Sequence, residues 1–115
     1  MRSDRLYLVD ILEACDAIAR FLAGAMTDAW VQDEVRQSAV MHKLIVIGEA
    51  AARLSNDFRT AHAELDWPGI IGFRNLAVHE YFAVSWSIVW VTATEDVPTL
   101  RSHVERILGE AFGSG

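Results

Sequence analysis

Five polar or ionisable side chains lie within eight consecutive residues of the segment GIIGFRNLAVHEYFAV: Arg74, Asn75, His79, Glu80 and Tyr81. Histidine can accept or donate a proton near neutral pH. Arginine can hold a phosphate and stabilise negative charge that develops in a transition state, and asparagine can orient the imidazole. Arg74 and His79 are therefore candidates for a catalytic pair, with Asn75 as a supporting residue. The chemistry that suits them is metal-independent cleavage of an RNA phosphodiester by its 2′-hydroxyl.

One histidine per chain is short of a full acid–base pair. A two-fold dimer that brings two copies of the motif together would supply the second group. The composition favours self-association, because the chain has only 115 residues and 52% of them are hydrophobic, so that part of its surface is expected to be covered by another subunit. The alternatives are a structural surface histidine at position 79 and an arginine that pairs with Glu80 or with an acid elsewhere.

The motif is expected to lie on one helix, on which each residue turns by about 100°. If Arg74 is set at zero, Tyr81 falls about 20° away, Asn75 about 100° and His79 about 140°. These side chains would share one broad arc, while the other side of the helix is apolar. Glu80 breaks this pattern because it points toward the apolar sector, and a distorted helix end near His79 would free it.

The rest of the chain also favours helices, since it has two prolines and no long alternating pattern. We expect an all-α fold, an antiparallel four- to five-helix bundle, that forms one domain over residues 1–110 with a flexible tail at 111–115. The expected elements are a helix from Ser3 or Asp4 to near residue 24, a turn, a helix over 33–54, a short helix or turn at 55–65, a motif helix capped by Asp66, a helix capped by Ser85, and a last helix opened by Pro98.

Two of these helices carry a predicted buried stripe. Gly48 weakens the second long helix but lets a neighbouring helix come close. The first helix is expected to bury Leu8, Ile11, Leu12, Cys15, Ile18, Ala19 and Leu22, and the second Val40, Leu44, Ile47, Ala51 and Leu54.

Glu49 has two interpretations. It could orient His79 or Arg74 across the bundle as a supporting carboxylate, or it could pair with Arg53 on its own helix, which general experience with helix surfaces favours. Arg53 and Lys43 are candidates for contacts with RNA. Trp86 and Trp90 are expected to pack in the core or in a dimer rather than to stack on bases.

Several classes of protein are disfavoured. The net charge of −6 argues against a general nucleic-acid coat and leaves room only for a local basic site, and no DNA contact is expected. The single cysteine, Cys15, excludes an internal disulfide and a cysteine-rich zinc site, and no cluster of ligands predicts a metal or a cofactor. Neither a membrane span nor a signal peptide is expected, and a reducing cytoplasm fits.

Arg74, four residues, His79, one residue and Tyr81 form a spacing that resembles the motif of the HEPN superfamily, in its HepT-like toxin branch. The likeness extends to YLVDILEACDAIARFL, VIGEAAARLS, WPGIIGFRNLAVHEYF and SWSIVWVTATEDVPTLRSHVERIL, which occur in the family's order and cover almost the whole chain.

This resemblance implies an all-helical, homodimeric, metal-independent endoribonuclease with its cleft at the dimer interface and with Arg74 and His79 as the catalytic pair. It also implies a toxin encoded beside a minimal nucleotidyltransferase antitoxin, which transfers AMP to Tyr81 and so neutralises the toxin. Some superfamily members bind nucleotides or act as structural modules. A non-catalytic helical dimer that binds a nucleotidyltransferase or a nucleotide is therefore the alternative.

Overall fold

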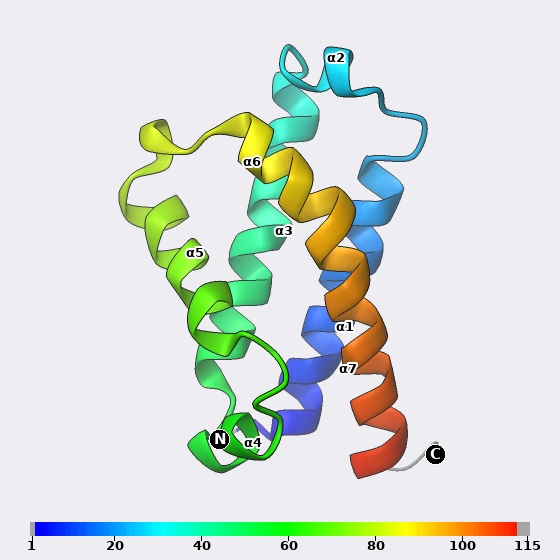
Figure 1. The fold of residues 1–115 in the computed structure, drawn as a ribbon, viewed down its shortest axis with the longest axis vertical. Coiled ribbons are helices and arrows are strands. Elements are labelled where there is room, and N and C mark those ends of the chain that lie inside the picture. Colours follow the sequence, from blue (N-terminus) through cyan, green and yellow to red (C-terminus); the bar gives the residue numbers. More distant parts are fainter. Residues whose placement is uncertain (1, 113–115) are drawn as a thin grey trace.

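Helices form almost all of this computed structural model, which describes residues 2–112 and contains no strand within them. Four long rods run alternately up and down (Figure 1). They are α1 (Asp4–Phe21), α3 (Glu34–Arg53), α5 (Trp67–His79), and a last rod in which α6 (Trp86–Val91), the π-helical turn η2 (Thr92–Asp96) and α7 (Val97–Ala111) are continuous. The short elements are α2 (Thr27–Trp30), α4 (Asn56–Ala61) and the 3₁₀ turn η1 (Tyr81–Ala83). The predicted all-α antiparallel bundle is confirmed.

Side-chain caps fix where most of these helices begin. The side chains of Ser3, Asp33, Ser55, Asp66 and Ser85 each accept a hydrogen bond from the backbone N–H three residues later. Each cap therefore satisfies one of the N–H groups that a first helical turn leaves unpaired. The starts predicted at Ser3, Asp66 and Ser85 are confirmed, and the turn predicted after the first helix contains the single-turn helix α2.

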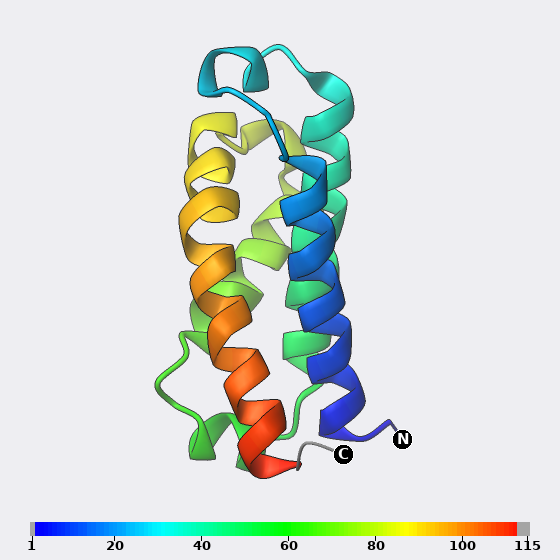
Figure 2. The ribbon, with the colours of Figure 1, turned by 90° about the vertical axis from the view of Figure 1, so that its right-hand side faces the viewer.

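The core lies between α1, α3 and α7, and α1 packs against both of the other two (Figure 2). The predicted stripe of α3 is buried in full, and most of the α1 stripe is at least half-buried. Ala19 was expected in the α1 stripe but is exposed, whereas Ala14 and Ala17 are buried. Two helices cover α1, so its buried sector is displaced toward Ala14 and Ala17.

Pro98 lies in the first turn of α7, as predicted, but this last helix is continuous with the one before it. The helix runs unbroken from α6 through η2 into α7, and Pro98 is the second residue of α7. A proline inside an α-helix lacks an N–H and clashes with the carbonyl four residues earlier. Here the wide turn η2 comes immediately before it, with the Val97 N–H bonded to the Thr92 carbonyl five residues back. This wider turn accommodates the proline without ending the helix.

Three tryptophans join the last rod to the turn after α1. Trp30 is buried, and its indole N–H donates to the Trp86 carbonyl at 2.7 Å. The Trp30 ring centroid lies 6.1 Å from that of Trp86 and 5.5 Å from that of Trp90. Packing, rather than base stacking, is thus the role of Trp86 and Trp90 in this chain, as predicted.

The carboxyl-terminal end of α7 reaches Ala111, one residue beyond the predicted domain boundary at 110. The Phe112 ring lies near that of Phe58, with centroids 6.4 Å apart. The remainder of the predicted tail, residues 113–115, is outside the described residues. Within residues 2–112, no helix combines the length and the apolar character that crossing a membrane requires.

Candidate active site

The motif helix α5 is held mainly by α3, on which it packs along its length. Its Ala77 is buried, and Ile70 and Phe73 are half-buried against the core. Gly48 of α3 lies directly under the Arg74 side chain at the point where the two helices meet. This close approach, which the glycine in the sequence predicted, directs Arg74 along the surface of α3 toward Glu49.

Arg74 and Glu49 form an ion pair across these two helices. Arg74 Nη1 donates to Glu49 Oε1 at 2.7 Å, and 21% of the arginine side chain is exposed, against 42% of the glutamate side chain. The expectation that Glu49 pairs with Arg53 is wrong, because Arg74 is the cation within ion-pair distance of its carboxylate among the described residues. The stem of Arg74 lies flat on α3, so its guanidinium reaches Glu49 from the neighbouring helix.

The guanidinium is not fully satisfied in this position. Arg74 Nε is buried and has no hydrogen-bond partner, and it is the single such side-chain atom within residues 2–112. Glu49 engages Nη1, which leaves Nη2 for another acceptor. An arginine held by one terminal nitrogen, with the other still available, suits recognition of a phosphate oxygen.

The helix ends at His79, which is the kind of helix end that would free Glu80 from the apolar sector. Glu80 has φ −137° and ψ 49°, its backbone N–H bonds to the Leu76 carbonyl at 2.8 Å, and its side chain is exposed. Glu80 is therefore free of the apolar sector in which a continued helix would have placed it.

The same helix end overturns the predicted position of Tyr81, which was placed about 20° from Arg74 on a continued helix. Tyr81 instead opens the 3₁₀ turn η1. Its ring centroid is 5.9 Å from that of Trp86 and 5.7 Å from that of Phe82, and 37% of the residue is exposed. Tyr81 stays close to His79 along the chain, but the structure does not stack it above Arg74.

His79 and Asn75 lie one turn apart on the exposed side of α5, and neither side chain is hydrogen-bonded within residues 2–112. Both are open to solvent and free to meet a ligand. Arg74 faces α3 on the flank of the same helix. Arg74 therefore contacts Glu49 directly. Asn75 and His79 lie on the same helix as Arg74 but do not contact this pair through a hydrogen bond.

The two predicted RNA contacts on α3 do not form one track. Arg53 is exposed in the last turn, one helical turn beyond Glu49. Lys43 is half-buried six residues before Glu49, about 120° around the helix from it. Arg53 thus lies on the flank of the Glu49–Arg74 pair, and Lys43 does not.

Exposed apolar side chains occur on the motif helix and on the two elements that follow it. Phe82 is 100% exposed, because the helix ends at His79 and Phe82 lies in the 3₁₀ turn after it. We call the following set the α5–α6 apolar patch: Leu76, Val78, Phe82, Ile88 and Val91, all exposed on α5, η1 and α6.

Comparison with known sequences places these features in a family. Residues 11–107 match the family described as Ribonuclease HepT-like. This chain belongs to the HepT-like ribonuclease family. The family predicted from the resemblance of the motif is thus confirmed, and the matched range of this HepT-like chain contains Arg74, His79 and Tyr81.

Curated relatives of the HepT-like chain span nearly its whole length. It is 35% identical over 108 residues to "Putative RNase TTE0752" of Caldanaerobacter subterraneus subsp. tengcongensis, which covers 94% of this chain and 96% of the relative. It is also 35% identical over 106 residues to "Probable ribonuclease HepT" of Thermococcus cleftensis, which covers 92% and 96%. "Putative RNase MJ1380" of Methanocaldococcus jannaschii is 31% identical over 104 residues, 90% and 95% of the two chains. No solved structure matches the chain.

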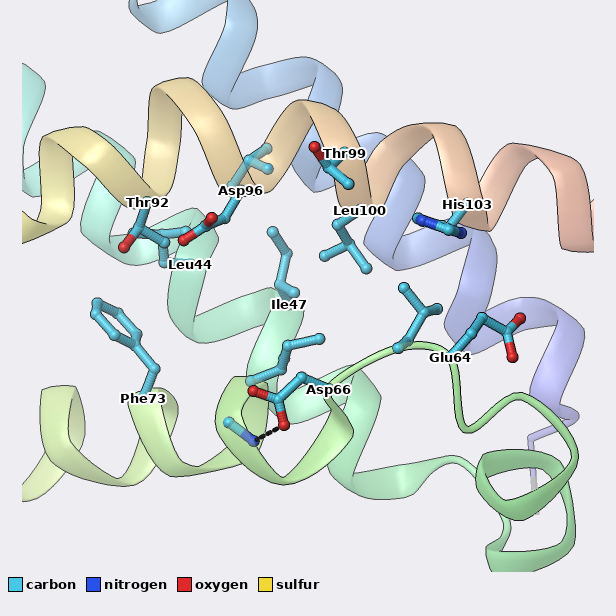
Figure 3. A pocket seen from close by; sticks show the side chains of 14 residues that line it. Leu44, Ile47, Glu64, Asp66, Phe73, Thr92, Asp96, Thr99, Leu100 and His103 are labelled. Atoms are coloured by element: carbon cyan, nitrogen blue, oxygen red, sulfur yellow. Dashed lines mark hydrogen bonds between the residues drawn. The ribbon is translucent and has the colours of Figure 1, made fainter.

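Two hollows flank α5 in the HepT-like chain. One of 460 Å³ lies between α3, α5, η2 and α7, with Asp66 and Asp96 on its wall (Figure 3), and no motif residue lines it. The other, of 860 Å³, lies between α4 and α5 and includes Arg59 and Asn75. The larger hollow therefore adjoins the motif. Within the described residues, no group of three or more histidine, cysteine or acidic side chains could hold a metal ion.

Proposed function

We propose that this HepT-like chain is an endoribonuclease that cuts RNA without a metal ion and acts as the toxin of a toxin–antitoxin pair. The observation that supports this most directly is that Arg74 of α5 pairs with Glu49 of α3, while α5 also presents an exposed His79 that has no hydrogen-bond partner among the described residues. The arginine is anchored while its second terminal nitrogen is available, and the imidazole is accessible. Phosphate recognition and proton transfer are thus combined on one helix.

In the proposed reaction, the RNA 2′-oxygen attacks the adjacent phosphorus, and the bond from phosphorus to the 5′-oxygen breaks. One imidazole accepts the proton of the 2′-hydroxyl, and a second protonates the departing 5′-oxygen. The products are a 2′,3′-cyclic phosphate and a 5′-hydroxyl. Arg74 donates to the non-bridging oxygens, on which negative charge accumulates in the transition state.

A homodimer would supply the second imidazole as His79 of another copy. The α5–α6 apolar patch supports this assembly, because Leu76 and Val78 are exposed on the motif helix itself and Phe82 is wholly exposed just after it. Burying one phenylalanine side chain contributes about 1.5–3 kcal/mol, so a second copy that covers this patch would gain stability. The active cleft would then lie between the two motif helices.

Regulation would act on Tyr81. A minimal nucleotidyltransferase antitoxin would transfer AMP from ATP to the tyrosine oxygen and release pyrophosphate. Tyr81 is partly exposed and two residues from His79, so a nucleotide there would add negative charge and bulk beside the place for the RNA phosphate. Asn75 would support the imidazole, and Arg53 and Lys43 would contribute RNA contacts.

The test is cleavage of defined RNA oligonucleotides in the presence of a chelator. Wild-type protein should give fragments that end in a 2′,3′-cyclic phosphate, whereas His79→Ala and Arg74→Ala should each lower the rate by at least about 100-fold. His103→Ala is the matched control, because His103 lies on α7 away from the motif, and it should cut at the wild-type rate. Full activity in both motif variants would refute the assignment.

Intact-mass measurement after co-expression with the nucleotidyltransferase tests the regulation. One or more added AMP units on a peptide that contains Tyr81, and none on the Tyr81→Phe protein, support it. A stable complex between the two proteins with neither cleavage nor modification would favour the alternative of a non-catalytic helical dimer.

A further inference from the structure

We infer that Gly48 is a positioning residue for RNA cleavage: because it lacks a side chain, Arg74 can lie across α3 and reach Glu49. This inference rests on the proposed ribonuclease function and adds a residue that does not touch the substrate. It concerns the one place where the motif helix and its supporting helix come closest.

The contact beneath Arg74 leaves no room for a side chain. A Cβ atom built on Gly48 would overlap Arg74 Cβ outright, would lie 2.8 Å from Arg74 Cγ, and would lie 3.3 Å from the Ile70 carbonyl oxygen. Ordinary contacts of this kind are 3.4–4 Å. Two of these three atoms belong to the backbone or to the rigid base of the arginine, so no rotation of a flexible tip relieves the overlap.

Gly72 and Gly109 also lie inside helices but differ from Gly48, whereas a Cβ on Gly69 would overlap the side chain of the cap residue Asp66. A Cβ on Gly72 or on Gly109 would meet no atom within 4 Å. A glycine inside a helix is unfavourable relative to alanine, and at Gly48 the space that it frees is filled by the stem of Arg74. The glycine thus serves the arginine rather than a turn or a cap, since it lies in the middle of α3.

The position of Arg74 is unfavourable for a second reason, which is an unpaired hydrogen-bond donor. Its Nε is buried without a partner, and a buried donor that has lost its water and gained no acceptor destabilises the fold. A helix-weakening glycine and an unsatisfied donor therefore meet at one contact. Local rules that favour stability are broken twice there, which is characteristic of functional sites.

This arrangement orients the guanidinium of Arg74. With the stem flat on α3, Nη1 reaches Glu49 at 2.7 Å, and the direction of the planar guanidinium is fixed. If α5 were displaced by a methyl group at position 48, the guanidinium would leave Glu49 and lose that direction. Catalysis is sensitive to such shifts, because a misplacement of about 1 Å can lower a rate about 100-fold.

The experiment is a double-mutant cycle between Gly48→Ala and Arg74→Gly, measured as kcat and KM for a defined RNA. Gly48→Ala should lower kcat by about 100-fold while the shape of the pH profile, set by the imidazole, stays unchanged. In the Arg74→Gly background, which removes the Cβ that the new methyl group would overlap, it should lower kcat by less than about twofold further, because it acts through the arginine. Gly109→Ala, in open space on α7, is the matched control and should keep the wild-type rate.

A folding comparison keeps the test decisive if Gly48→Ala alone fails to fold. Arg74→Gly removes the Cβ and Cγ atoms that the new methyl group would overlap, so thermal unfolding should show Gly48→Ala to be much less harmful in that background. Equal harm in both backgrounds, or a wild-type kcat for Gly48→Ala, would overturn the inference. Wild-type kcat for Arg74→Ala would instead refute the proposed role of Arg74, which is a separate result.

Discussion

Replacement of Glu49 by glutamine separates the stabilising role of its ion pair from its role in orienting Arg74. Glu49→Gln keeps an oxygen that can accept from Arg74 Nη1 but removes the charge. A hydrogen bond to a charged group contributes about 1.5–3 kcal/mol and a neutral one about 0.5–1.5 kcal/mol, and the pair is partly solvated, with 42% of the glutamate side chain exposed. The loss of unfolding free energy should therefore be about 1 kcal/mol, or about 4 °C in Tm for a domain of this size.

A loss of that size leaves more than about 99% of the molecules folded, given a typical stability of 5–15 kcal/mol. Any large fall in activity must then come from the site itself. We expect kcat/KM for a fluorogenic RNA to fall by about 10–100-fold, with Tm measured on the same samples.

Glu110→Gln is the matched control, because Glu110 pairs with Arg106 one turn away on the surface of α7. It should change neither quantity appreciably, since such exposed pairs contribute about 0.3–0.5 kcal/mol. The reasoning would be refuted if Glu49→Gln cleaved RNA at the wild-type rate while Arg74→Ala did not.

Three further predictions concern other parts of the bundle. Burial raises the pKa of the Cys15 thiol to about 12, so mass spectrometry should find it unalkylated at about pH 8 in the native protein and alkylated after denaturation. Trp30→Phe removes the donor to the Trp86 carbonyl and should lower the unfolding free energy in urea by about 1–3 kcal/mol. The Glu64 backbone N–H, with help from His62 and Arg106, lowers the pKa of the Glu64 carboxyl from 4.5. Its stabilising contribution is therefore complete above that value and lost as the pH falls through the lowered pKa, so Glu64→Gln should reduce the drop in Tm between about pH 6 and about pH 3.

The helices could be predicted because their local signals agree with their packing. Ser3, Asp66 and Ser85 are good capping residues at the starts of apolar periodic segments, and the structure uses each as a cap. The stripe of α3 follows helical spacing on the side that faces α1, so hydrophobic periodicity was sufficient to predict its buried residues. Ala19 was misplaced because periodicity shows a face but not how many helices cover it.

The candidate site could be predicted in its residue types but not in its contacts. Glu49 has Arg53 four residues away on its own helix, and no local pattern reveals that Arg74, 25 residues later, lies closer. That pairing depends on how α5 packs on α3. Tyr81 was misplaced for a related reason, because the helix was extended past His79, where the backbone departs from helical geometry.

The π-helical turn η2 has a consequence for how this chain can change in length. Eight residues separate Val89 from Val97, which on an uninterrupted α-helix would set them about 80° apart, yet both are buried. The wider turn absorbs one surplus residue and keeps the two in register. Deleting one residue from Thr92–Asp96 would remove that surplus and leave an ordinary α-helix, on which Val89 and Val97 would lie about 20° apart. Leu100, Val104 and Ile107 would then keep facing the core. Homologous chains can therefore lose one residue in this segment without turning α7, whereas a single deletion within α7 itself would rotate every later residue of the helix by about 100°.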